Sequence, residues 1–92
     1  MGAHGSLKLA RVQDHVRTVL AIELLCAAQG LDLRLPLRPG PGLRAAHARL
    51  REHVSPMLED RPIAPDIRAV RKIMDDGSLL ASAVDALSTR ER

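Results

Sequence analysis

The stretch VLAIELLCAA, residues 19–28, decides the fold, and it runs from Val19 to Ala28 with Glu23 as its only charged residue. Upstream of it, apolar residues recur at steps of three and four, which is the spacing of one helix face. Within the stretch the apolar character extends to all sides, and a helix that is apolar all round is normally buried all round. We therefore expect a long helix that packs against several neighbours.

Capping signals give this helix its expected bounds. Ser6 is a good N-cap, Gly30 can end the helix in a left-handed conformation, and no Pro or Gly lies between them. The expected organisation is one helical segment over 1–92. It consists of a long helix at 1–30, a Pro/Gly connector at 31–42, short helices at 43–87 and a tail at 88–92 that frays.

The remaining sequence predicts three short helices and no sheet. Prolines and glycines at 36–42 prevent a helix there, and the Leu pattern at 31–35 suggests an extended packing segment. Helices are expected at about 43–53, from Pro65 to a stop at Gly77, and from a Ser78 cap onward. We expect Asp75 and Asp76 to oppose the dipole of the third helix. The residues expected to face inward are Leu43, Ala46, Leu50, Val54, Ile67, Val70, Ile73, Met74, Leu80, Val84 and Leu87.

Size and composition limit what this chain can bury. It has 92 residues, 46% of them hydrophobic, and no Phe, Tyr or Trp. A compact fold of this mass would leave about 5,000 Å² exposed. The missing aromatics exclude a tyrosine base, an aromatic cage and a base-stacking platform. Three short helices can hardly surround the long one, so we expect it to pack on partners outside the chain.

The charge pattern does not favour nucleic acid or membrane as a partner. The formal net charge is +3, but 14 basic residues are interleaved with 11 acidic ones. The best local basic cluster is Arg68, Arg71 and Lys72, on a helix separated from its predecessor by a long loop rather than by the short turn of a helix-turn-helix motif. The apolar run is too short to span a bilayer, which takes about 20 residues.

An export signal is not expected either. Basic residues precede the apolar run, as in a secretory or lipoprotein signal, but Glu23 interrupts the run and Leu25, not a small residue, precedes Cys26. With a single cysteine and no such signal, we expect a cytoplasmic location.

The sequence assigns no catalytic, cofactor-binding or metal-binding residue. The four histidines are His4, His15, His47 and His53, and their spacing is not that of a metal site. We expect them to be solvated or to cap helices. Cys26 has no His three or four residues away and is expected to act as a small hydrophobe. Glu23 is costly to bury unpaired, so it lies either at an interface facing an Arg from elsewhere or on a wet strip of the helix.

Three stretches in order resemble the C-terminal part of histidine ammonia-lyase, in the aromatic amino acid ammonia-lyase family. They are VLAIELLCAAQGLDLR at 19–34, PLRPG at 36–40 and DRPIAPDI at 60–67. The first residues, MGA at 1–3, are similar to the family segment that follows an acidic stretch. The similarity covers roughly residues 1–80 and is far more specific than a lone short motif.

The resemblance implies an all-α fragment of a larger helical-bundle lyase fold, from homotetramers with long helices in a central multi-subunit bundle. The family eliminates ammonia from L-histidine to give urocanate, using a methylidene-imidazolone group made from an Ala-Ser-Gly triad, and a Tyr. This chain has no Ala-Ser-Gly and no Tyr. The family's active-site Glu belongs to the stretch before the position that matches Met1. We therefore expect the chain by itself to be inactive and to hold no cofactor.

The resulting hypothesis is a structural and oligomerisation segment of a histidine ammonia-lyase-like enzyme of histidine degradation. Its partners would be the rest of the subunit and other subunits, contacted through the helix around 19–28. One alternative is an independent small helical protein-binding module. Another is the tail of a phenylalanine or tyrosine ammonia-lyase or aminomutase.

Overall fold

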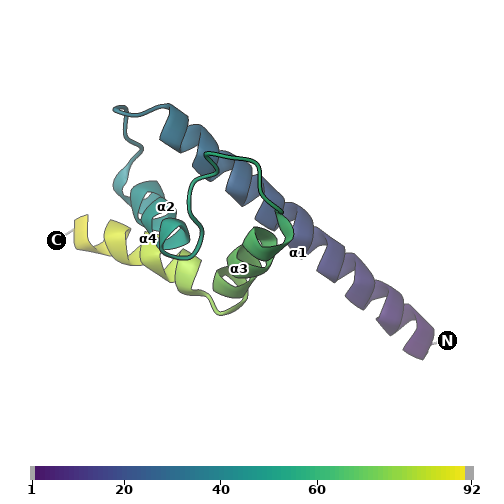
Figure 1. Ribbon diagram of the computed structural model, residues 1–92. Coiled ribbons are helices and arrows are strands. Elements are labelled where there is room, and N and C mark those ends of the chain that lie inside the picture. Colours follow the sequence, from purple (N-terminus) through teal and green to yellow (C-terminus); the bar gives the residue numbers. More distant parts are fainter. Residues whose placement is uncertain (1, 91–92) are drawn as a thin grey trace.

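The computed structural model describes the backbone of residues 2–90 and the side chains of residues 5–88, and within that range it contains four helices and no strand (Figure 1). They are α1 (Gly2–Leu33), α2 (Pro41–His53), α3 (Ala64–Asp75) and α4 (Ser78–Arg90). The all-α prediction is confirmed. The expectations for Met1, for the side chain of His4 and for residues 91–92 lie outside the described residues.

Helix α1 is longer at both ends than its capping signals predict. Ser6 lies inside the helix rather than at its cap, and Gly30 does not end it, because α1 continues to Leu33. A helical glycine costs about 1 kcal/mol relative to alanine, so side-chain contacts with other segments offset that cost here. The carboxylate of Asp32 contacts α2, and the amide of Gln29 bonds to the loop after α2. The segment 31–33 is therefore helical, not extended.

The ends of α4 differ from expectation in two respects, while the end of α3 does not. Gly77 ends α3 as predicted, with φ of 79°. Ser78, however, is the first residue of α4 and not its cap. Its backbone N–H donates to Oδ1 of Asp76 at 2.8 Å, and this bond lowers the pKa of the Asp76 carboxyl. Asp76 thus supplies negative charge at the N-terminus of α4, which is favourable. The expected fraying tail is also partly helical, since α4 extends to Arg90.

The core is small and lies where α3 and the end of α2 meet the second half of α1. Its buried apolar residues are Ala21, Ala28, Leu50, Val54, Val70 and Ile73. In α4, Leu80, Val84 and Leu87 do not face inward as predicted, and Leu79 packs on the core instead. Leu87, although half exposed, lies against α2, where a Cβ on Gly42 would meet its Cγ at 3.1 Å.

The first half of α1 projects beyond the other three helices (Figure 1). The molecule measures 53 × 40 × 17 Å and exposes 7014 Å². A compact chain of this mass would expose about 5,000 Å². The prediction that this chain cannot cover its long helix is therefore confirmed. No helix within residues 2–90 is long and apolar enough to cross a membrane.

Candidate functional site

One face of α1, which we call the outer face, is an exposed row of apolar side chains. It consists of large side chains at steps of three and four that are between 43% and 59% exposed: Leu9, Val12, Val16, Val19 and Leu20. The opposite side of the helix packs on α3 through Ala21 and through polar contacts. Within 19–28, only Ala21 and Ala28 are buried, so burial on all sides does not occur in this chain alone.

Glu23 lies in line with the outer face, three residues after Leu20 and seven after Val16. It is exposed and makes no ion pair within the described residues. Of the two predicted environments, the wet strip is the one found in the isolated chain. An apolar partner placed over this face would have to bring a cation to Glu23, because an unpaired carboxylate is costly to desolvate.

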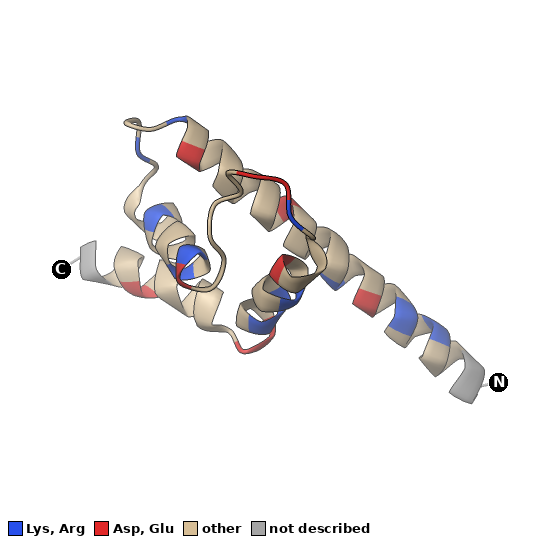
Figure 2. Cartoon of the chain, in the orientation of Figure 1, with Lys and Arg blue, Asp and Glu red and all other residues tan. Residues whose placement is uncertain are grey.

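Polar contacts hold α3 on the inner side of α1. The guanidinium of Arg71 lies 2.7 Å from a carboxylate oxygen of Asp14 and donates a hydrogen bond to Oγ1 of Thr18 at 3.1 Å. The hydrogen bond and the positive charge of Arg71 lower the pKa of the Asp14 carboxyl. Arg71 is thus a packing residue, while Arg68 and Lys72 of the predicted basic cluster are exposed. Basic and acidic residues are spread over the whole molecule (Figure 2).

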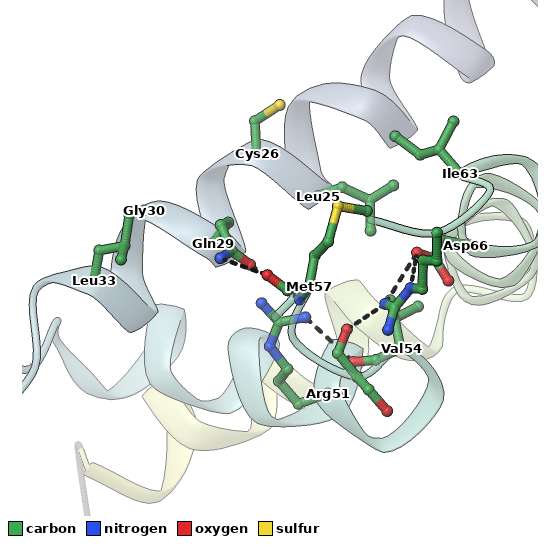
Figure 3. A pocket seen from close by; sticks show the side chains of 12 residues that line it. Leu25, Cys26, Gln29, Gly30, Leu33, Arg51, Val54, Met57, Ile63 and Asp66 are labelled. Atoms are coloured by element: carbon green, nitrogen blue, oxygen red, sulfur yellow. Dashed lines mark hydrogen bonds and ion pairs between the residues drawn. The ribbon is translucent and has the colours of Figure 1, made fainter. Parts of the chain in front are cut away.

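A pocket of about 360 Å³ lies between the end of α1, the end of α2 and the loop that leads to α3 (Figure 3). Gln29 links the loop to α1, since its amide accepts from the Met57 N–H at 3.3 Å and donates to the Met57 carbonyl at 3.4 Å. Arg61 donates to the Ser55 carbonyl and to Asp66. These polar groups are engaged with the protein itself, so the pocket presents mainly apolar walls.

Cys26 stands at the edge of this pocket and is exposed. Figure 3 shows its side chain pointing away from Gln29 and Met57. Cys26 is exposed because it lies on a side of α1 that no other helix of the described residues covers. Within residues 2–90 no three His, Cys, Asp or Glu side chains gather as metal ligands.

A charged cluster that sequence reasoning missed joins α1 to α2. Oδ2 of Asp32 accepts two hydrogen bonds from the guanidinium of Arg51, and Oδ1 lies 2.9 Å from Nε2 of His47. Nε2 of His47 lies close to this carboxylate but forms no hydrogen bond with it. His47 is partly buried, so the expectation that it is solvated or capping is wrong, whereas His15 and His53 are exposed. The available signal was the spacing of His47 and Arg51, which places both on one face of a helix.

What the geometry offers is therefore a binding surface rather than a reaction centre: an exposed apolar helix face with one carboxylate in it, and an apolar pocket. Soluble monomers rarely expose large contiguous apolar patches, so an exposed apolar helix face is usually an interaction site.

Comparison with known proteins identifies related sequences. Residues 1–52 match the sequence model of a family described as aromatic amino acid lyase. The chain is 48% identical over 87 residues to a histidine ammonia-lyase of Sorangium cellulosum, a match covering 95% of this chain and 17% of the relative. It is 54% identical over 79 residues to the histidine ammonia-lyase of Anaeromyxobacter dehalogenans, covering 86% and 16%. It is also 48% identical over 86 residues to the histidine ammonia-lyase of Myxococcus xanthus, a match covering 94% of this chain and 17% of the relative.

The chain thus spans 16% to 17% of the length of these relatives. No solved structure matches it.

Proposed function

The chain belongs to the aromatic amino acid lyase family, and on that premise we propose that it serves as a structural and assembly segment of a histidine ammonia-lyase. Such an enzyme eliminates ammonia from L-histidine to give urocanate, and histidine degradation is the process in which it acts. The similar proteins reported above are histidine ammonia-lyases, which supports the histidine branch over the phenylalanine and tyrosine branches.

One observation carries the structural role: the outer face of α1 is apolar, continuous and exposed in this chain. In a larger enzyme the natural covering for such a helix is the rest of the subunit and further subunits. Covering each large side chain gains roughly 25 cal/mol per Å² of apolar surface removed from water. The face therefore supplies free energy for assembly rather than chemistry.

In this proposal the catalytic groups come from residues outside the segment. The chain has no Tyr and no Ala-Ser-Gly triad, so it contributes neither a tyrosine base nor the precursor of a methylidene-imidazolone group. The chain contributes to the reaction indirectly: by packing against neighbouring segments, it holds in place the catalytic groups that those segments carry.

A second candidate is an independent helical binding module. The observation in its favour is that six apolar residues from α1, α2, α3 and the residue after α2 form a buried cluster within this chain. A module of this kind would be folded and monomeric without any enzyme partner.

Rescue in trans tests the proposal. The Anaeromyxobacter dehalogenans relative, lacking the stretch that this chain matches, is co-expressed with the chain, and urocanate formation from L-histidine is followed by absorbance. We expect neither part to be active alone and the pair to be active. Because Val16 and Val19 are exposed here, a V16D/V19D variant should fold normally and fail to rescue. The matched control is Leu58→Asp, at a loop residue that is 89% exposed, which should rescue.

Three results would contradict the proposal. One is urocanate formation by the chain alone. Another is rescue by V16D/V19D as efficient as by the parent chain. The third is absence of rescue when both parts are well expressed and the chain is folded and monomeric, which favours the binding module. A complementary test uses the full-length relative, where Asp at the position aligned with Leu24 should disrupt assembly, because Leu24 packs against the core.

A further inference from the structure

A second pocket, which we call the connector pocket, lies between the connector after α1 and one side of α2, and its volume is about 560 Å³. Leu35, Leu37 and Pro39 line it from the connector, and Ala45 and Ala48 line it from α2. The two alanines are three residues apart and share a helix face, and their short side chains leave the space open. Sites for small molecules occupy about 300–1,000 Å³ and are mostly apolar. The connector pocket therefore has the size and the walls of a small-molecule site.

The local sequence keeps the connector pocket open without a ligand. Pro39 and Pro41 fix the backbone angle φ at two positions of the segment that leads into α2, where Pro41 is the first helical residue. At the other end of the connector, the Leu37 N–H donates to the Arg34 carbonyl at 2.9 Å, and the Arg34 N–H donates to the Leu31 carbonyl at 3.1 Å. A ligand that enters this pocket therefore has to order little of the chain, which favours binding.

Two guanidinium groups, those of Arg38 and Arg44, border the connector pocket. Both residues are exposed, and neither makes an ion pair within the part of the chain that the structure describes. No acidic residue among those described lines the pocket. Asp32, which lies close to His47 in the pocket wall, is already paired with Arg51. The connector pocket thus combines apolar walls with two positive charges that no described carboxylate neutralises.

These two features select a ligand with two parts. The apolar walls favour a hydrocarbon body, because the removal of apolar surface from water is favourable. The two guanidinium groups favour an anion, and the planar fork of their donors matches a carboxylate. A carboxylate suits this position better than a phosphate, because a single charge costs less than two to bring beside apolar walls. A neutral ligand would leave both arginines without a partner, and a cation would be repelled.

We propose that the connector pocket binds a small carboxylate with an apolar body, whose charged end is held by Arg38 and Arg44. This site goes beyond the proposed assembly role. It is tested by binding to the chain itself, so its absence and a failure of rescue in trans are separate results.

Fluorescence anisotropy of naphthylacetate, titrated with the full chain, tests the proposal. The chain has no Phe, Tyr or Trp, so the signal of the probe is free of protein fluorescence. We expect saturable binding that weakens as salt is added, because the two guanidinium groups are exposed. Naphthylethanol has a similar body without the charge. It should bind about tenfold more weakly, since it loses two exposed charge contacts.

Substitutions locate the binding at the connector pocket. Arg38→Gln and Arg44→Gln should each raise the Kd for naphthylacetate about threefold to fivefold. The matched control is Arg68→Gln, which removes the same charge from an exposed residue of α3 and should leave the Kd unchanged. Ala48→Leu fills the pocket from an exposed position of α2 and should raise the Kd about tenfold. Circular dichroism checks that each variant keeps its helices.

The proposal is overturned if naphthylacetate does not bind saturably or if naphthylethanol binds as tightly. It is also overturned if Arg38→Gln and Arg44→Gln act no more strongly than Arg68→Gln. Unchanged binding by a folded Ala48→Leu chain would show that the probe occupies another part of the surface. A short peptide that ends in leucine is the second probe. If its free C-terminus binds more tightly than naphthylacetate, and its amidated form does not bind, the pocket takes a protein partner and the small-molecule assignment is wrong.

Discussion

Asp32 in the last turn of α1 and Arg51 in α2 form a two-bond ion pair, in which Oδ2 of Asp32 accepts from both Nε and Nη2 of Arg51, the former at 3.1 Å. The two residues are 19 positions apart and lie on opposite sides of the Pro/Gly connector. A single carboxylate thus fixes where α1 ends and how α2 returns toward it.

Replacing Arg51 by Met should weaken this link while keeping the apolar stem of the side chain. The Asp32 and Arg51 side chains are only 22% and 15% exposed, so their pairing is partly shielded from water. We expect the free energy of unfolding to fall by about 1–3 kcal/mol, measured by urea denaturation followed by circular dichroism. The control is Arg34→Met, at an exposed arginine of the same connector. Equal effects of the two substitutions would show that the ion pair contributes nothing specific.

Asp14 should titrate below its ordinary value, because the hydrogen bond and charge of Arg71 lower the pKa of its carboxyl from 3.8. A carboxyl whose pKa is depressed in the folded state stabilises the fold above its unfolded pKa. That contribution is lost as the pH falls below 3.8 and through the folded pKa. Carboxyl chemical shifts from NMR measure this pKa directly. Arg71→Gln should return it toward 3.8, whereas Arg68→Gln, at an exposed arginine of α3, should not.

Gly42 and Leu87 control how closely α2 and α4 pack. A Cβ at Gly42 would meet Cγ of Leu87 at 3.1 Å, so the two branches of valine cannot be accommodated without moving α4. Gly42→Val should lower the free energy of unfolding by about 1–3 kcal/mol. Adding Leu87→Ala should recover most of this loss, measured as a double-mutant cycle. Strictly additive effects of the two substitutions would contradict the close contact.

Ile73 is a large side chain of the small core and is only 1% exposed. Ile73→Ala leaves a cavity beside Ala21 and Val70, and we expect a loss of about 2–5 kcal/mol. For a chain that buries so little, this loss should leave it largely unfolded, measured as loss of helical circular dichroism at 25 °C. Leu80→Ala is the control, since Leu80 is 71% exposed and its truncation should change stability little. A folded Ile73→Ala chain would show that the core does not stabilise this fold.

The existence and order of the helices could be predicted from local rules, but only some of their ends could. Apolar spacing marks each helix, and Pro65 and Gly77 mark the bounds of α3, because these signals act within a few residues of one another. Pro41 was expected in the connector, yet it is the first residue of α2, where its fixed φ suits a helix start. Gly30 shows the limit: it is a good stop signal by itself, yet contacts of Asp32 with distant residues extend α1 past it. Leu50 of α2, Val54 just after it, and Val70 and Ile73 of α3 are buried as predicted, whereas Leu43, predicted to face inward from α2, is 55% exposed.

Some features of the candidate site could likewise be predicted from the sequence, and others could not. That a run such as 19–28 carries more apolar surface than three short helices can bury follows from the sequence, because it depends only on composition and length. Which side of α1 is covered, the exposure of Cys26, and the position of Asp32 between His47 and Arg51 follow from the packing of the helices. Those facts depend on the packing angle of helices joined by a Pro/Gly connector. The relative position of such helices is set by contacts between distant residues and not by local preference.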